Sequence, residues 1–164
     1  MPYSTMPLKE ICALPVQEIA DKDCLLFLWA TMPKLPEALK VINAWGFRYT
    51  TCAFVWVKVN KKGKVYQNKR NIIIENGIYS GLGSWTNGNA ELCLLAKRGR
   101  PKRNLKNVKQ ITLAPVGRHS TKPLIVRPKI VDLCGDLPRV ELFARDKVSD
   151  WQCWGNEVES DIKL

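Results

Sequence analysis

Apolar residues along the chain fall into two kinds of run, some continuous and some spaced like one face of a helix. The continuous run CLLFLWA (residues 24–30) predicts a buried strand, because it is apolar throughout and too short for a typical helix. Residues 34–46 place apolar side chains at helical spacing and end in glycine, which predicts a helix. Residues 47–59 are rich in aromatic and β-branched side chains and predict a second strand. A helix interrupted near Pro15 is expected over residues 7–20.

The second half of the chain continues the alternation of strands and helices. Strands are predicted at residues 89–99, 109–115 and 139–145, and a helix is predicted at residues 122–135. The polar stretch at residues 60–71 predicts a loop. The strand, helix, strand order with continuous apolar strands predicts an α/β fold, with a mainly parallel sheet and helices on both faces.

The length and composition of the chain indicate a single soluble domain and argue against membrane-spanning and metal-binding proteins. The 164 residues are expected to form one soluble domain, residues 1–164, because no apolar run reaches the roughly 18 residues of a membrane span. The six cysteines form no C-x-x-C pair and mostly lie in or beside apolar runs, which indicates reduced thiols in a cytosolic protein. With His119 as the single histidine, no metal site is expected. Trp29, Trp45 and Trp56 are expected in the core.

The charge is large and unevenly distributed. The net charge is +11, and the stretch between Glu91 and Asp132 contains no acidic residue and eleven basic ones. A second stretch without acids runs from Glu37 to Glu75. Two such segments suggest a polyanionic partner, most simply nucleic acid. A solvated basic surface is the alternative, and acidic lipid is a weaker one because neither segment has an amphipathic helical pattern.

Loops after the predicted strands carry candidate ligand-binding side chains. In α/β sheets, ligands bind in the crevice outside the carboxyl ends of the strands. Lys122, Arg145 and Asn156 are expected to meet at that edge, where they would suit a ligand with a carboxylate and hydroxyls. The alternative is that Arg145 only caps a strand end and Lys122 only solvates a helix start.

Eight motifs between Pro2 and Glu157 occur in an order that resembles one known family. They are PYSTM, LFLWAT, NAWGFRY, FVWVK, GLGSWTNGNAELCLLAKRGRPKR, HSTKP, ELFAR and WGNE. Together they resemble the MT-A70 family of S-adenosylmethionine-dependent adenine N6-methyltransferases. The resemblance implies a Rossmann-like class I methyltransferase fold in a bacterial or phage cytoplasmic protein. It also implies methyl transfer from S-adenosyl-L-methionine to adenine in nucleic acid, with DNA favoured over RNA, and leaves a homodimer or heterodimer open.

One family motif is absent from the sequence. The family carries Asp-Pro-Pro-Trp shortly before the Tyr-x-Thr-Met loop, whereas this chain begins at that loop and contains no Pro-Pro dipeptide. In the family, the motif accepts hydrogen bonds from the adenine amine, which is a poor nucleophile, and stacks on the base. The resemblance therefore implies an N-terminally truncated domain with no assigned catalytic residue, in which cofactor binding survives and transfer is lost. The alternative is a non-catalytic nucleic-acid-binding subunit or pseudoenzyme of the same fold.

The resemblance assigns the cofactor residues one at a time. Lys122 matches a lysine on the loop that closes over the methionine end of the cofactor, where its charge meets the carboxylate. Arg145 matches an arginine that binds the ribose region, and Asn156 matches a residue that binds the ribose hydroxyls. Glu157 stands where some relatives carry glutamine, and either side chain accepts a hydroxyl hydrogen bond. Val148 replaces an asparagine of eukaryotic relatives, so one cofactor hydrogen bond is expected to be missing.

Substrate contacts are assigned in the same way. Tyr3 matches a tyrosine beside the substrate base, or is a loose terminal residue. Glu91 matches a glutamate near the substrate that can pair with a basic loop residue, or it faces water at a strand start. Trp85 lies in a Gly-rich segment and is a candidate for stacking on a base. Five basic residues are expected to contact phosphates without reading sequence: Lys97, Arg98, Arg100, Lys102 and Arg103.

Overall fold

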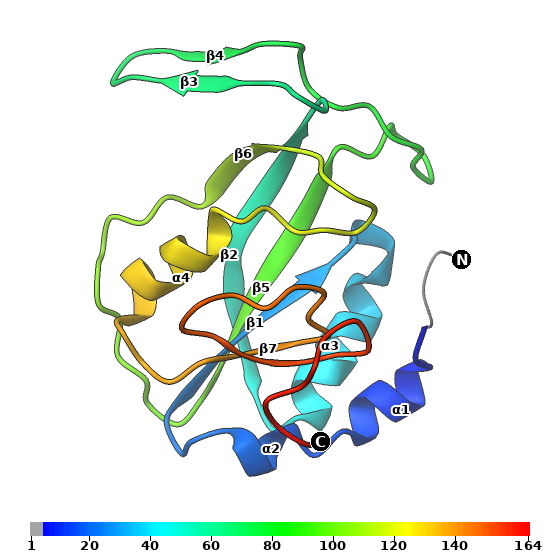
Figure 1. The fold of residues 1–164 in the computed structure, drawn as a ribbon, viewed down its shortest axis with the longest axis vertical. Coiled ribbons are helices and arrows are strands. Elements are labelled where there is room, and N and C mark those ends of the chain that lie inside the picture. The colour runs from blue at the N-terminus through cyan, green and yellow to red at the C-terminus, as the bar shows by residue number, and fades with distance from the viewer. Residues whose placement is uncertain (1–4) are drawn as a thin grey trace.

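The computed structural model describes residues 5–164, which form a central sheet, two small sheets and the helices around them (Figure 1). The helices are α1 (Leu8–Ala13), α2 (Val16–Ile19), the 3-10 helix η1 (Met32–Lys34), α3 (Leu35–Ala44) and α4 (Val126–Cys134). The strands are β1 (Cys24–Ala30), β2 (Arg48–Val59), β3 (Val65–Gln67), β4 (Ile72–Ile74), β5 (Ala90–Arg98), β6 (Ile111–Pro115), β7 (Val140–Leu142) and β8 (Gln152–Trp154).

The central sheet has the strand order β1-β5-β2-β6. β5 runs antiparallel to both of its neighbours, and only β2 and β6 are parallel. The prediction of a mainly parallel sheet is therefore wrong. The reason is that β5 is covered on both faces, so this antiparallel strand carries the same continuous apolar sequence that a buried parallel strand would carry.

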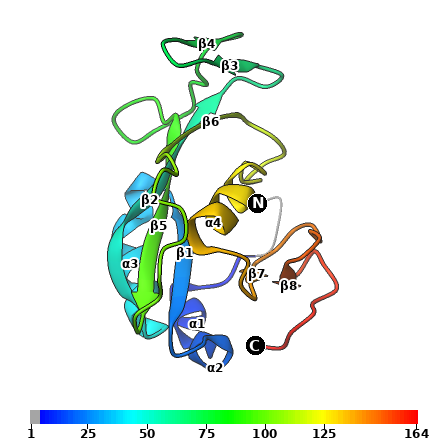
Figure 2. The same cartoon turned by 90° about the vertical axis from the view of Figure 1, so that its left-hand side faces the viewer.

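Helices cover both faces of the central sheet, as predicted (Figure 2). On one face, Ile42 and Trp45 from α3 and its C-cap pack in the same cluster as Leu94 of β5. On the other face, Val126 of α4 packs with Cys93. Because Cys93 and Leu94 are neighbours on β5, they point to opposite faces of the sheet, and both are fully buried. Within residues 5–164, no helix is long and apolar enough to cross a membrane.

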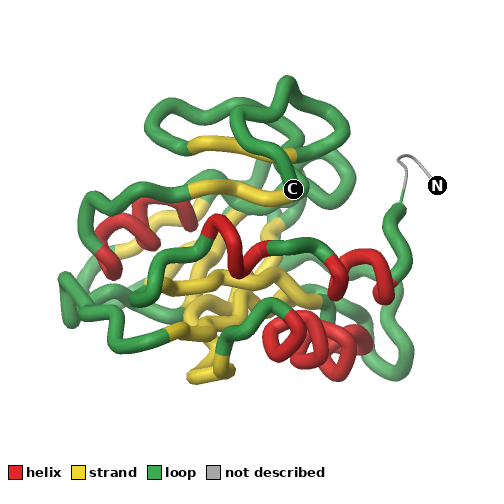
Figure 3. The backbone as a smooth tube through the Cα atoms, turned by 90° about the horizontal axis from the view of Figure 1, so that it is seen from below, coloured by secondary structure: helices red, strands yellow, loops and turns green. Residues whose placement is uncertain are grey.

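The two ends of the central sheet differ. Val59 at the end of β2 pairs with Pro115 at the end of β6, and the start of β5 lies at the same end beside Val57. The hairpin formed by β3 and β4 projects beyond this end (Figure 1), which we call the hairpin end. The short helices α1 and α2 lie at the opposite end, and Figure 3 views the molecule from there, with helices on both sides of the strands.

The long elements match the sequence predictions better than the short ones do. β1 coincides with the predicted strand at residues 24–30, and α1 and α2 are separated at Pro15 as expected. β3 lies in the stretch of residues 60–71 that was expected to be a loop, and no element was assigned to residues 72–74 of β4, because three-residue strands leave no clear periodic signal. β8 was not predicted for the same reason, and β7 is shorter than the seven residues expected.

β1 and β6 are the edge strands of the central sheet. Within the described part of the chain, β1 pairs only with β5, so its outer edge has no strand neighbour. The sequence of β1 is apolar throughout, and its side chains are half-buried up to the buried Ala30. An apolar edge strand of this kind is uncommon, because edge strands usually carry charges or proline.

Candidate functional site

Glu91 is a buried carboxylate at the hairpin end of the central sheet. It is the second residue of β5, opposite Trp56 on β2, and it is 7% exposed. The Lys58 ammonium of β2 lies 2.8 Å from one carboxylate oxygen, and the Lys122 ammonium donates to the other. Burial alone would raise the pKa of Glu91, but the hydrogen bonds from Lys122 and Lys58 together hold it below its usual value. Glu91 is therefore ionised at neutral pH and bound on both oxygens.

Two indole rings enclose these charges. The Lys58 ammonium lies 5.2 Å from the centroid of the Trp56 ring, and the Lys122 ammonium lies 5.6 Å from that of Trp29. The two rings meet edge to face with their centroids 6.4 Å apart. Trp56 is buried as expected, whereas Trp29 is only half-buried and lines the site. Aromatic walls exclude water and strengthen the interactions of the charges beside them.

The loop between β6 and α4, residues 116–125, connects Glu91 to a second group of charges. Lys122 belongs to this loop and reaches Glu91. Three residues earlier, the His119 carbonyl accepts a hydrogen bond from the Arg145 guanidinium. Arg145 also lies 2.9 Å from a carboxylate oxygen of Glu157. Residues 116–125 thus join the β5 site to the segment that follows β7.

A further ion pair joins this loop to the same segment. Arg118 donates to both carboxylate oxygens of Asp146, at 2.9 and 2.8 Å. Both hydrogen bonds come from one terminal nitrogen of Arg118, and both side chains are exposed, so this is a weak surface ion pair. Residues 118–122 thus contact the segment after β7 through Arg118 and β5 through Lys122.

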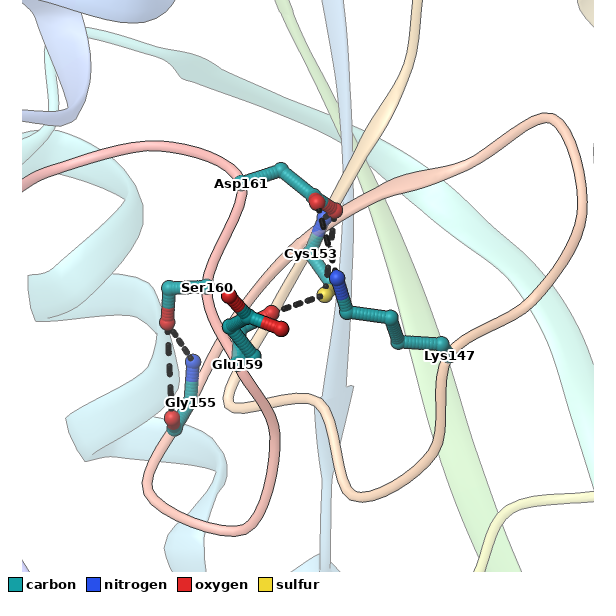
Figure 4. Close-up of polar contacts among 6 residues, drawn as sticks. All are labelled: Lys147, Cys153, Gly155, Glu159, Ser160 and Asp161. Atoms are coloured by element: carbon teal, nitrogen blue, oxygen red, sulfur yellow. Dashed lines mark hydrogen bonds and ion pairs between the residues drawn. The ribbon is translucent and has the colours of Figure 1, made fainter.

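The turn that carries Asn156 and Glu157 is closed by its own hydrogen bonds (Figure 4). Asp161 accepts a hydrogen bond of 2.9 Å from the Cys153 backbone N–H, and its carboxylate pairs with Lys147 at 3.0 Å. The Ser160 hydroxyl accepts from the Gly155 N–H at 3.2 Å. These contacts bring the two ends of the turn together and leave Asn156 and Glu157 on its exposed side.

The structure thus brings most of the predicted ligand-binding residues around one loop. Lys122 pairs with Glu91, so the interpretation of Glu91 as a water-facing strand start is wrong, and pairing with a basic loop residue is confirmed. Arg145 pairs with Glu157, and Asn156 is the preceding residue on that turn. Tyr3 lies outside the described residues.

Lys58 is a site residue that was not predicted from the sequence. It lies on the same face of β2 as Trp56, two residues away, and meets Glu91 from the neighbouring strand. A lysine that interrupts the apolar run FVWVKV was a usable signal, because a charge on a buried strand needs a partner. The register between β2 and β5, which identifies that partner, is not encoded in either strand alone.

Trp85 is the most exposed aromatic residue of the site region. It lies 99% exposed between β4 and β5, and Leu82 is fully exposed as well. The loop is narrow, because Gly81 and Gly88 form a bridge between its two sides. A side chain at Gly83 would meet the Thr86 carbonyl oxygen at 1.9 Å, so glycine is required there. The loop therefore presents Trp85 and Leu82 to solvent near the start of β5.

The predicted phosphate-binding residues lie at the other end of β5. Lys97 is six residues beyond Glu91, or roughly 20 Å along an extended strand. The Arg98 guanidinium donates to the Gln17 carbonyl at 3.0 Å, and the Arg100 N–H donates to Asp23 at 2.7 Å. Lys102 and Arg103 follow in the exposed loop after them. The structure therefore separates Lys97, Arg98, Arg100, Lys102 and Arg103 from Glu91, Lys122 and Trp85.

A family model and two related proteins each match nearly the whole chain. A family model described as MT-A70 matches residues 1–157. The chain is 34% identical over 158 residues to the type II methyltransferase M.MunI of Mycoplasma sp, in an alignment that covers 95% of this chain and 60% of that protein. It is 27% identical over 160 residues to a probable N(6)-adenosine-methyltransferase MT-A70-like protein of Oryza sativa subsp. japonica, covering 96% of this chain and 21% of that protein. The chain spans less than two thirds of the length of either relative.

Proposed function

This chain belongs to the MT-A70 family, and we propose that it contributes to methyl transfer from S-adenosyl-L-methionine to the N6 amine of adenine in nucleic acid, with DNA favoured over RNA. The proposal is carried by one observation, the ion pair between buried Glu91 and Lys122, whose loop also contacts Arg145. The Rossmann-like class I fold of a single domain, residues 1–164, is part of the same proposal, and helices on both faces of the sheet support it.

The residues around the loop suit the chemical groups of the proposed cofactor. Lys122 supplies a cation for the methionine carboxylate, while Asn156 and Glu157 supply an amide and a carboxylate for ribose hydroxyls. Lys58 allows Lys122 to leave Glu91, because the buried carboxylate keeps one cationic partner when Lys122 turns toward a ligand. When bound, S-adenosylmethionine supplies an activated methyl group on a positively charged sulfur.

The substrate side of the proposal rests on Glu91 and Trp85. Glu91 is ionised and held by two lysines, so it can accept hydrogen bonds from a nucleoside positioned beside Trp29. Trp85 is free to stack on an unpaired base, and an adenine must leave its stack before its amine can react. No residue of this chain is assigned as the group that accepts hydrogen bonds from the adenine amine.

A methyl-transfer assay tests the proposal. The chain is incubated with S-adenosylmethionine carrying a labelled methyl group and with single-stranded or double-stranded DNA or RNA, and the nucleosides are separated after digestion. The same assay is run with the chain joined to an upstream segment that carries Asp-Pro-Pro-Trp. Label in N6-methyladenine in either form supports the proposal, and the substrate that gains most label identifies the nucleic acid. No label in either form, with nucleic-acid binding intact, would instead identify a non-catalytic binding subunit.

A further inference from the structure

The β3–β4 hairpin is an ordered arm rather than a loose loop. Residues 60–75 leave the central sheet directly after β2 and project beyond its end (Figures 1 and 2). At the base of the arm, the Asn60 N–H donates to the Gly77 carbonyl at 3.1 Å. At its tip, the Asn68 side-chain oxygen accepts from two backbone N–H groups at 2.8 Å each. A Cβ at Gly63 would lie 2.5 Å from the Val59 side chain, so the turn next to the sheet requires glycine.

The arm carries a dense and uncompensated positive charge. Its one acidic residue is Glu75. None of its cations forms an ion pair with a carboxylate anywhere in residues 5–164, and all of them are exposed. The cations are Lys61, Lys62, Lys64, Lys69 and Arg70. Exposed cations without acidic partners on a projecting element are the electrostatic signature of a polyanion contact.

The arm differs from the basic stretch that begins at Lys97 in its distance from Glu91. Trp56, the strand partner of Glu91, is three residues before Val59 at the end of β2, so the base of the arm begins about 10 Å from the site. The stretch that begins at Lys97 starts at the opposite end of β5. The base of the arm is therefore nearer to Glu91 than Lys97 is.

One face of the arm also offers an apolar pair. Tyr66 and Ile73 are directly opposite each other in the hairpin and are 47% and 59% exposed. Such a pair can contact sugars and bases, or it can contact another protein. The five neighbouring cations favour nucleic acid, because a protein partner would have to bury or neutralise them.

We propose that residues 60–75 form a nucleic-acid-binding arm, which contacts the phosphate backbone next to the nucleotide held at Glu91. This inference rests on the proposed function, since it names the surface that holds the substrate of that site. The contacts are to phosphates, so the arm sets affinity and position rather than sequence preference.

Two matched sets of substitutions test the arm. One variant replaces its five cations by glutamine (K61Q/K62Q/K64Q/K69Q/R70Q), and the control replaces five exposed cations of the other stretch (R100Q/K102Q/R103Q/K106Q/K109Q). Both lose the same charge, so a general electrostatic effect would weaken both equally. Binding of a fluorescent DNA duplex is measured by anisotropy over a series of salt concentrations. Circular dichroism melting checks that each variant folds, and K69Q/R70Q at the tip of the arm provides a smaller change.

The salt dependence reports how many phosphate contacts each set makes. Each lost contact lowers the slope of log K against log salt by about 0.9 for duplex DNA. We expect the arm variant to lower the slope by about two or more, K69Q/R70Q by about one, and the control by less than about one.

Three outcomes would overturn the inference. The first is an equal or larger loss of binding in the control variant. The second is unchanged DNA binding in the arm variant together with a smaller assembly in light scattering, which would identify the arm as a protein interface. The third is an unaltered chain that binds neither DNA nor RNA, which would remove the proposed substrate class as well. In the first two outcomes, the proposed function stands and only the arm is rejected.

Discussion

Lys58 and Glu91 face each other across two neighbouring strands, with 2.8 Å between the ammonium nitrogen and a carboxylate oxygen. Both residues belong to the rigid central sheet, whereas Lys122, the second partner of Glu91, belongs to a loop. The two lysines therefore have different expected roles. Lys58 keeps the buried carboxylate paired in every state of the site, and Lys122 is the partner that can be exchanged for a ligand.

Replacing Lys58 should affect stability first. In Lys58→Met, Glu91 loses the partner held by the sheet, and we expect the free energy of unfolding to fall by about 1 to 3 kcal/mol. Urea unfolding followed by circular dichroism measures this change. Lys34→Met, which removes an exposed ion pair on the protein surface, is the control and should change stability by less than about 0.5 kcal/mol. Equal effects of the two substitutions would show that Lys58 does not support Glu91.

Replacing Lys122 should affect cofactor affinity more than stability. A charged hydrogen bond contributes about 1.5 to 3 kcal/mol, so Lys122→Ala should weaken S-adenosylmethionine binding by about 10- to 100-fold. Isothermal titration calorimetry measures the dissociation constant, with Lys122→Arg as the variant that keeps the charge and should restore part of the affinity. An unchanged dissociation constant in Lys122→Ala would remove this residue from the cofactor site.

The ionisation of Glu91 makes part of the stability depend on pH. Its pKa in the folded protein is lowered from the ordinary value of 4.5, because the hydrogen bonds from Lys122 and Lys58 outweigh the effect of burial. The pair therefore contributes its full stability above about pH 4.5, and loses it as the pH falls through the lower folded pKa. Urea unfolding of the unaltered chain and Glu91→Gln should differ by a constant amount at neutral pH and converge in acid. A difference that grows as the pH falls would contradict this assignment.

Trp85 should matter for nucleic acid and not for folding. Its side chain is 99% exposed, so Trp85→Ala should leave the melting temperature unchanged. Stacking on a base contributes about 1 to 3 kcal/mol, and binding to single-stranded DNA should weaken by about 5- to 150-fold. Trp85→Phe retains an aromatic face and should lose less affinity for single-stranded DNA. If Trp85→Ala binds as the unaltered chain does, the loop is not a stacking surface.

The sequence patterns predicted the buried elements well, for a clear physical reason. α3 carries apolar side chains at the helical period and β1 is a short, continuous apolar run, so both positions can be predicted without knowing their neighbours. Strand direction is different, because a strand covered on both faces is apolar whether its neighbours are parallel or antiparallel. The antiparallel course of β5 was therefore not predictable from its composition.

Most residues of the candidate site were predicted from the sequence, but among their contacts only the pairing of Glu91 with a basic loop residue was. Lys122, Arg145 and Glu91 were identified from motifs, yet their contacts depend on where the loop of residues 116–125 lies. Lys58 was missed because its partner is set by strand register. Lys97 was expected to contact phosphates of the substrate as part of a basic stretch, and Glu91 was expected near the substrate as well. An extended strand moves the two apart by roughly 20 Å.

The positive charge of this protein also affects its self-association through the outer edge of β1. Among residues 5–164 no strand pairs with the outer edge of β1, and an uncharged edge strand of this kind is a template on which another copy can add a strand. At low ionic strength, the net charge of +11 makes copies repel one another before their edges meet. Added salt shortens the range of that repulsion to about 8 Å at physiological strength and removes the protection. Colloidal stability of the purified chain should thus decline as salt rises, a trend that turbidity measurements would record directly.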